Sequence, residues 1–385
     1  MSERSETKRP TPPTNPVAAH IASRWERLGP PRRIAGVDLA RGLAVFGMFA
    51  AHLIDLPEAF VWTEPATWSA IAAGRSSILF ATLAGVSIGL MTGGRDRLRG
   101  DAMAVARGRL AVRALAFLVL GFLLILTGIP VFVILPAYAF LFVLAIPLTG
   151  LSARSLVVFA AVVALAMPFL QALIDAGDFW QTPDGSDIGL LIGWHYPFLT
   201  WIAFVAAGLA CARAGMRRRI VQVRMLCAGA VLAVAAYGAD ALTGVDRAAE
   251  AESLWSAVWT ARAHSTGLLE VVGSGGFALA VIALCALLCS WRPAMYATLP
   301  LRAVGAMPLT AYVGQLVVWA MVASSELGDT GDLSGFRALD PFWPFAVGTL
   351  LLCTGWMLLV GRGPLESLID RVGRLLVPAP DGSRR

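Results

Sequence analysis

The sequence predicts an all-α fold: a polytopic integral membrane helix bundle with about ten transmembrane helices and both termini in the cytoplasm. Of the 385 residues, 57% are hydrophobic and only 15% are charged, which is too apolar for a soluble globular protein of this length. Several apolar runs reach the roughly 20 residues that cross a bilayer. The segments between the runs alternate between basic and acidic, as they do in membrane proteins that keep Lys and Arg in cytoplasmic loops.

The charge alternation fixes the expected sidedness. Segments that are basic, then acidic, then basic again follow one another in this order: 24–33, 55–64, 95–109, 175–187, 213–224, 240–252, 292–302, 326–340 and 362–374. An even number of spans with basic flanks places both termini on the cytoplasmic side. Several Trp residues gather beside the acidic segments, as in an aromatic belt at the outer interface. We therefore expect a multi-pass protein of the bacterial inner (plasma) membrane.

Three regions are expected along the chain. Residues 1–33 are polar, rich in Pro and Arg and without the apolar core of a signal peptide, so they are predicted to form a disordered cytoplasmic tail. Residues 34–370 would form the membrane domain, and residues 371–385 a second cytoplasmic tail. No soluble domain is expected, because the loops are too short to hold a core.

Each expected span ends where charged or turn-forming residues resume. In chain order the spans are 34–55 up to Asp55, 71–93 before Arg95, 108–127 before the turn Thr127–Pro130, 129–149 before Arg154, 154–173 before Asp175, 189–212 before Arg213, 222–242 before Asp246, 267–290 before Arg292, 303–324 before Glu326, and 342–361 before Arg362.

Polar groups inside the first span are informative, because each is costly in a membrane. Asp38, Arg41 and His52 fall on one helical stripe. Asp38 and Arg41 can pair near the cytoplasmic end. His52 lies about 21 Å from Asp38 along the helix, near the outer end. One interpretation is purely structural: an ion pair at the inner edge of the membrane and a His at the outer interface. The position of all three residues on one stripe favours a functional role instead.

A second group of polar residues is expected at the outer ends of the spans. His52, His195 and His264 all fall there, as do Arg75 and Ser265. His can act as a base or nucleophile, and Arg can hold a carboxylate, a phosphate or an oxyanion. We predict a catalytic group of the three His residues and Arg75. The alternative is that three spans each end in one amphipathic interfacial residue.

Two more polar residues lie inside later spans. Glu270 lies about 9 Å below His264 along its helix and could be protonated, paired with Arg75 or part of a proton relay. Gln315 is expected to bond a neighbouring helix. No metal site is predicted: Cys285 and Cys289 share a helix face, but no His or acid accompanies them.

These residues carry a family resemblance. Ile34–Ala44 resembles the opening helix of the heparan-α-glucosaminide N-acetyltransferase-like membrane proteins, with Gly36 where Ser or Ala is common. The sequence also resembles the YeiB-type branch of these proteins, whose activity is largely unassigned. Three later segments fit that branch: His264–Ser274, Pro308–Tyr312 and Gly363–Glu366.

The resemblance implies acyl transfer across the membrane from cytoplasmic acetyl-CoA or another acyl-CoA, with His52 in the position of the essential His. In the animal relatives that His lies further along, in the loop after the first span. Asp38, Arg41, Arg109 and Arg113 would lie near the acyl-CoA. The expected partners are the lipid bilayer, the acyl-CoA co-substrate and an envelope glycan or lipid acceptor, with no nucleic acid and a homodimer left open. No tightly bound cofactor is expected.

The sequence leaves two other functions open. One is a transporter or exporter of a small molecule or lipid precursor, in which Glu270 and the His residues relay protons. The other is a scaffold without chemistry, in which the stripe through Asp38, Arg41 and His52 only packs helices. Proton-coupled uptake that is insensitive to acyl-CoA would favour the transporter, and tolerance of substitutions in the stripe would favour the scaffold.

Overall fold

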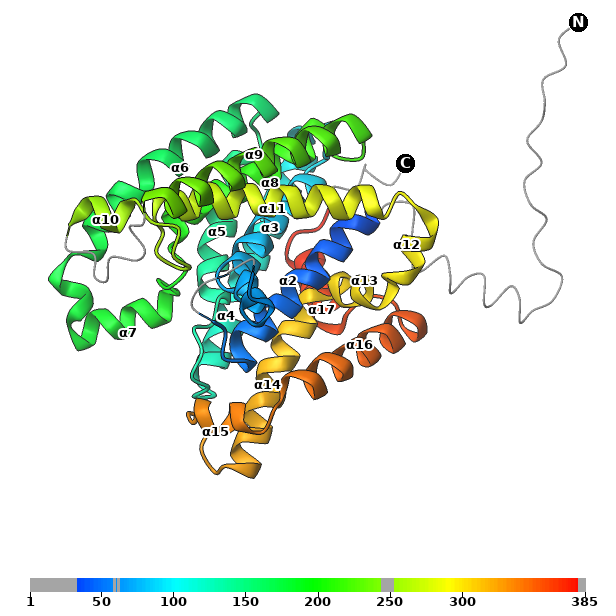
Figure 1. The fold of residues 1–385 in the computed structure, drawn as a ribbon. Helices are drawn as coiled ribbons and strands as arrows, with labels where there is room; N and C mark the ends of the chain where they lie inside the picture. Colours follow the sequence, from blue (N-terminus) through cyan, green and yellow to red (C-terminus); the bar gives the residue numbers. More distant parts are fainter. Residues whose placement is uncertain (1–32, 58–59, 61–62, 244–252, 380–385) are drawn as a thin grey trace, which may run out of the picture.

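The computed structural model describes residues 33–57, 60, 63–243 and 253–379, which form helices and no strand (Figure 1). Eight stretches within these residues are long and apolar enough to cross a membrane. They are α2 (Ala35–Leu53), α3 (Arg75–Met91, preceded by the 3₁₀ helix η1, Pro65–Ala72), α4 (Gly100–Ile125), α6 (Ala153–Asp175), α9 (Arg219–Thr243), α11 (Leu268–Leu288), α14 (Pro308–Glu326) and α16 (Phe342–Leu359). Two shorter apolar helices join them: α5 (Leu135–Leu148) and α8 (Phe198–Ala214).

The other helices are shorter. They are η2 (Asp178–Gln181), α7 (Pro183–Ile192), α10 (Leu254–Val258), α12 (Arg292–Ala297), α13 (Leu299–Ala306), α15 (Leu333–Ala338) and α17 (Pro364–Leu376). The predicted tail over residues 1–33 lies outside the described residues except for Arg33.

Helix α2 runs through the middle of the bundle and packs against α3, α11 and α13 (Figure 1). Its glycines allow close approach, because a Cβ atom at Gly36 would meet the backbone of α11 and one at Gly42 would meet the backbone of α13. Gly85 of α3 faces the backbone of α8 in the same way. Helix α3 also packs directly against α2, so both helices can line the same internal cavities.

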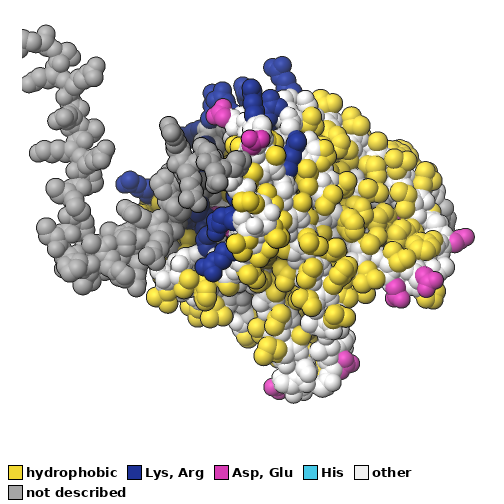
Figure 2. All heavy atoms as spheres, turned by 180° about the vertical axis from the view of Figure 1, so that it is seen from behind, with side chains coloured by type: hydrophobic (Ala, Val, Ile, Leu, Met, Phe, Trp, Pro, Cys, Tyr) yellow, Lys and Arg dark blue, Asp and Glu magenta, His cyan; other side chains and the backbone are white. Residues whose placement is uncertain are grey.

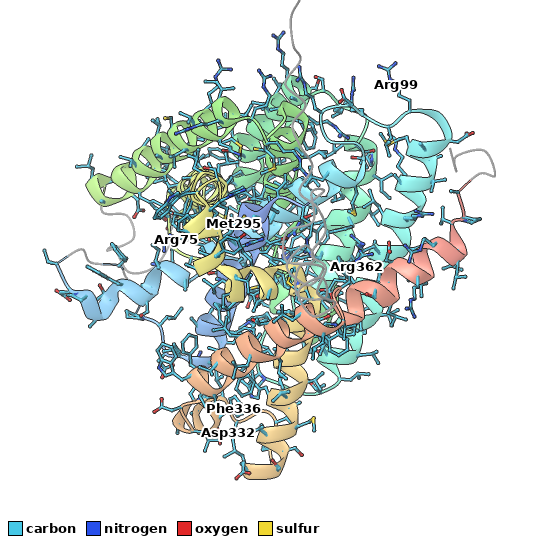
Figure 3. The ribbon with its side chains drawn as sticks, turned by 90° about the vertical axis from the view of Figure 1, so that its right-hand side faces the viewer. Arg75, Arg99, Met295, Asp332, Phe336 and Arg362 are labelled. Atoms are coloured by element: carbon cyan, nitrogen blue, oxygen red, sulfur yellow. The ribbon has the colours of Figure 1, made fainter. Side chains whose placement is uncertain are left out.

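The outer surface of the bundle is apolar. Side chains such as Val234 of α9 and Leu352 of α16 are 73% and 75% exposed, which suits contact with lipid rather than water. A broad hydrophobic surface separates the clustered Arg side chains from most of the visible acidic ones (Figure 2). Arg99 and Asp332 mark these two ends of the molecule (Figure 3). We call them the basic end and the acidic end.

Some expected spans are broken in the structure. The span expected over 189–212 is divided, because Gly193 ends α7 with a φ of 70° and α8 begins only after Pro197. The span expected over 303–324 is divided at Met307, where Pro308 starts α14 instead of continuing α13. The helix expected from residue 129 begins at Leu135, after an irregular segment. That segment lies between the two cavities described next.

Candidate functional site

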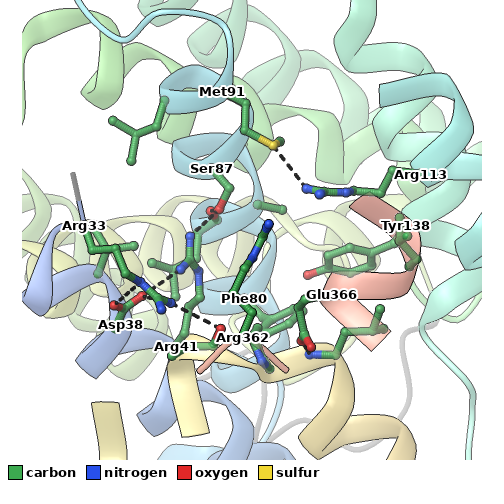
Figure 4. A pocket seen from close by; sticks show the side chains of 18 of the residues that line it. Arg33, Asp38, Arg41, Phe80, Ser87, Met91, Arg113, Tyr138, Arg362 and Glu366 are labelled. Carbon is green, nitrogen blue, oxygen red and sulfur yellow. Dashed lines mark hydrogen bonds and ion pairs between the residues drawn. The ribbon is translucent and has the colours of Figure 1, made fainter. Parts of the chain in front are cut away.

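A cavity of about 950 Å³ lies toward the basic end. We call it the basic cavity. Helices α2, α3, α4, α5, α14, α16 and α17 contribute to its walls. Its charged lining residues are Arg33, Asp38, Arg41, Arg113, Arg362 and Glu366 (Figure 4). The remaining wall is mostly apolar and aromatic, so the cavity suits a molecule with an anionic end and an apolar or extended end.

Asp38 organises the charges on one wall of the basic cavity. Its carboxylate is 4% exposed and lies 3.0 Å from Arg33 Nε and 3.0 Å from Arg41 Nη1. Arg41 also donates from Nη2 to Ser87 Oγ on α3 at 2.6 Å. Two guanidinium groups therefore share one carboxylate, and the pairing expected between Asp38 and Arg41 is present.

The two predicted Arg residues of α4 have different positions. Arg113 lines the basic cavity, with its Nη1 3.1 Å from the sulfur of Met91. Arg109 lies one turn earlier and instead donates to the carbonyl oxygen of Val377 at 3.2 Å, where α17 ends. The structure therefore places Arg113 at the cavity and Arg109 in a helix-to-helix contact.

Tyr138, which was not singled out from the sequence, forms part of the inner wall of the basic cavity. Its side chain is buried, and its ring centroid lies 5.6 Å from that of Phe80. Its hydroxyl has no hydrogen-bond partner among the described residues. Figure 4 shows this hydroxyl directed into the cavity. A ligand carbonyl or amide could satisfy it there.

A smaller cavity of about 200 Å³ lies toward the acidic end, and we call it the histidine pocket. His52, His195 and His264 all line it. The rings of His195 and His264 are 4.6 Å apart, and Phe132 stacks on His195 at 4.0 Å. The structure thus brings together three His residues from α2, from the turn before α8 and from the loop before α11.

Two of these imidazoles lie outside the membrane-spanning helices. Burial lowers the pKa of His195 to about 4. Burial, with the neighbouring His195, lowers the pKa of His264 to about 3. Both rings are therefore neutral near pH 7, and each keeps a nitrogen able to accept a proton or hydrogen bond.

His52 is held from two sides. Its Nδ1 atom lies 3.5 Å from Gln315 Nε2 on α14, which is the helix-to-helix contact expected for Gln315. Arg337, at the end of α15, donates from Nε to the backbone carbonyl of His52 at 3.2 Å and also pairs with Asp55. Arg337 lines the pocket as well. Arg337 was not singled out from the sequence.

Arg75 is directed away from the histidine pocket. Its Nε donates to the hydroxyl of Tyr237 on α9 at 2.9 Å, and its Nη1 donates to the carbonyl of Ala70 at 3.1 Å. The neighbouring residues Gly74 and Ser76 line the pocket, but Arg75 does not. The sequence places Arg75 at the correct end of the bundle without giving the direction of its side chain.

Ser265 belongs to the loop that carries His264, and Glu270 lies in the first turn of α11, directly after this loop. The carboxylate of Glu270 accepts hydrogen bonds from the backbone N–H groups of His264 and Thr266 and from the hydroxyl of Ser265. Within the described residues, no three His, Cys, Asp or Glu side chains are arranged to hold a metal ion.

The basic cavity and the histidine pocket follow one another along α2 and α3. Arg41 lines the first and His52 the second, about 16 Å apart along α2. The irregular segment before α5 lies between them. It is held by Tyr312, whose hydroxyl accepts from the Ile134 N–H at 3.3 Å, and by Tyr196, whose hydroxyl donates to the Phe132 carbonyl at 3.1 Å.

Comparison with known families identifies the family of the chain. Residues 33–243 match the family model described as heparan-alpha-glucosaminide N-acetyltransferase, catalytic. The chain belongs to this family. Residues 217–373 match a second family, described as a protein of unknown function, DUF418. The resemblance noted from the sequence is therefore confirmed, and no curated protein matches the chain.

The two family matches divide the site between them. His52 and His195 fall in the heparan-α-glucosaminide N-acetyltransferase match, whereas His264 falls in the DUF418 match. In the basic cavity, Arg41 belongs to the first match and Glu366 to the second. Both matched regions contribute lining residues to each cavity.

Proposed function

We propose that this protein is a membrane acyltransferase that moves an acetyl or other acyl group from a cytoplasmic acyl-CoA to an extracytoplasmic glycan or lipid acceptor. The observation that carries the proposal is the alignment of the two cavities along α2 and α3, with Arg side chains at one and three imidazoles at the other. In this proposal the basic end faces the cytoplasm of a bacterial cell, and the chain lies in the inner membrane.

The basic cavity would bind the acyl-CoA. Arg33, Arg41, Arg113 and Arg362 would contact its phosphates, since guanidinium groups match phosphate geometry. The extended thiol-bearing arm would follow the apolar and aromatic wall past Tyr138 toward the histidine pocket. The volume of the basic cavity, about 950 Å³, falls within the range of volumes of small-molecule binding sites.

The histidine pocket would hold the reacting atoms. His52 would take the proton from the acceptor hydroxyl or amine as that oxygen or nitrogen attacks the thioester carbonyl. The new C–O or C–N bond forms, the C–S bond breaks, and the proton passes from the imidazole to the departing thiolate. The positive charge of Arg337 would stabilise the oxyanion. A transient acyl group on His52 is the two-step variant of the same chemistry.

The test uses permeabilised membrane vesicles containing the protein and acetyl-CoA labelled in its acetyl group. The wild-type protein is expected to transfer label to material in the glycan or lipid extract. His52→Ala should abolish transfer while the protein still inserts, because the proton acceptor is lost. His20→Ala, in the N-terminal segment, is the matched control and should retain activity. Full transfer by His52→Ala would refute the assignment.

A further inference from the structure

Glu270, at the start of α11, has an unusual set of partners. Its side chain is buried, and both carboxylate oxygens accept hydrogen bonds from the preceding loop. Oε1 accepts from the His264 N–H at 2.6 Å, and Oε2 accepts from the Thr266 N–H at 2.7 Å and from Ser265 Oγ at 3.2 Å. One carboxylate thus holds three successive residues of the loop.

The loop that it holds is strained. His264 has a φ of 62° and Thr266 a φ of 58°, both in the left-handed region. Residues with a side chain rarely adopt this conformation, and a β-branched residue such as Thr does so least readily. Such strain persists only where surrounding contacts impose it, and it clusters at functional sites.

The strained conformation directs His264 into the histidine pocket. Its ring lies 4.6 Å from that of His195 and 5.8 Å from that of Tyr196. The loop is fixed at its start by the Glu270 N–H, which donates to the Thr260 carbonyl at 3.0 Å. The groups that oppose relaxation of residues 264–266 are therefore centred on Glu270.

The other roles considered for Glu270 fit these contacts less well. A proton relay would require a carboxyl group facing a cavity or water path, whereas both oxygens of Glu270 are used by the loop. No ion pair joins Glu270 to Arg75 among the described residues, and the guanidinium of Arg75 bonds Tyr237 and the carbonyl of Ala70 instead.

We propose that Glu270 is a positioning residue: its carboxylate holds His264 and Thr266 in their left-handed conformations and thereby keeps the His264 imidazole in the histidine pocket. The role of that imidazole in acyl transfer rests on the proposed function, but the positioning itself does not. The proposal predicts that the loop is released when the charge of the Glu270 carboxylate is removed. It also predicts that the loop depends less on this carboxylate when the backbone strain at Thr266 is removed.

The experiment measures the rate at which diethyl pyrocarbonate modifies His264 in the full-length protein, followed by mass spectrometry. In the wild-type protein the buried ring should react slowly. Glu270→Gln should react about tenfold faster or more, because the loop loses charge-assisted hydrogen bonds and turns the ring outward. Ser274→Ala, a buried substitution one turn deeper in α11, is the control and should leave the rate unchanged.

A second substitution tests the strain. Glycine adopts the left-handed conformation without cost, so Glu270→Gln combined with Thr266→Gly should return the modification rate toward that of the wild type. If Glu270→Gln fails to accumulate in the membrane, the double variant should restore accumulation. An unchanged rate in Glu270→Gln, or a double variant that shows no recovery, overturns the proposal.

The readout separates this proposal from the proposed function. Modification of His264 needs neither acyl-CoA nor an acceptor, so an inactive protein still reports the position of the ring. If acyl transfer is also observed, it should fall in Glu270→Gln and recover in the double variant. Transfer that falls without a change in His264 modification would contradict positioning as the cause.

Discussion

The residues of the histidine pocket show how far sequence reasoning reaches. His52, His195 and His264 could be placed at one end of the bundle, because loop charges report sidedness. Their meeting in one pocket depends on helix packing that the sequence does not encode locally. The same limit explains Arg75, which lies at the right end of the bundle but bonds Tyr237.

Protonation of the pocket gives a first prediction. The pKa of His195 is about 4 and that of His264 about 3, against 6.5 for an ordinary His, so the unfolded chain binds these protons first as the pH falls. Above about pH 6.5 the rings are neutral in both the folded and the unfolded chain, and they do not lower the free energy of unfolding. As the pH falls below 6.5, the unfolded chain takes up protons that the folded protein does not, so the free energy of unfolding decreases until the pH reaches the folded-state pKa of each ring. We expect about 2 kcal/mol to be lost for each ring between pH 7 and pH 5, about 4 kcal/mol in total, measured by thermal unfolding of the purified protein through its Trp fluorescence.

A matched variant separates the contribution of these two rings to the pH dependence of stability from that of other titratable groups. Replacing both His195 and His264 with Gln should make the loss between pH 7 and pH 5 smaller, whereas His20→Gln should not. An equal loss in the double variant would show that these imidazoles do not set the pH dependence.

Arg337 and Arg75 give a second prediction. Arg337 lines the histidine pocket and caps α2 beside His52, so Arg337→Ala should lower acyl transfer about a hundredfold. Arg75→Ala should leave transfer per folded protein nearly unchanged, because its guanidinium faces Tyr237. Steady-state transfer of label from acetyl-CoA compares the two. Equal losses in both variants would argue against Arg337 as the cationic group of the pocket.

At the scale of elements, two segments that the sequence singled out are joined. Glu366 of α17 accepts from the backbone N–H groups of Leu309 at 2.8 Å and Thr310 at 3.1 Å, and from the hydroxyl of Thr310 at 2.5 Å. The carboxylate therefore caps the first turn of α14, where the helix dipole favours a negative charge. This link closes one wall of the basic cavity.

The link between α14 and α17 gives a third prediction. Glu366→Ala leaves the N–H groups of α14 without their acceptor and should lower the free energy of unfolding by about 1–3 kcal/mol. Asp370→Asn is the control, since its partners Arg362 and Arg374 have side chains 58% and 55% exposed. Each of these ion pairs, with an exposed Arg partner, should contribute at most about 1 kcal/mol to the free energy of unfolding. Thermal unfolding in one detergent compares the variants, and a larger effect at Asp370 would contradict the capping role.

The positions of the apolar helices were largely predictable, and their breaks were not. The first span, expected over 34–55, is the helix Ala35–Leu53. The breaks at Gly193 and Met307 arise from a left-handed residue and from a Pro that starts a new helix. The mean hydropathy of a sequence window does not reveal such breaks, because the residues on both sides of each break are equally apolar. The segment before α5 was assigned to a helix for the same reason.

At the scale of the whole molecule, the charge pattern and the cavities agree. The loops that alternate in sign along the sequence gather at two ends, separated by an apolar surface (Figure 2). Each end has its own cavity, and α2 and α3 line both. Acyl transfer in this arrangement would carry the acyl group from one face of the membrane to the other without moving the whole donor.

The most direct test of that claim compares sealed membrane vesicles of opposite orientation. Labelled acetyl-CoA, which is charged and stays where it is added, is supplied only to the outside. Inverted vesicles, which expose the basic end, should accumulate labelled acceptor in the lumen, protected until the membrane is opened. Right-side-out vesicles should accumulate none. Equal labelling in both orientations, or labelled acceptor on the same face as the donor, would contradict transfer across the bilayer.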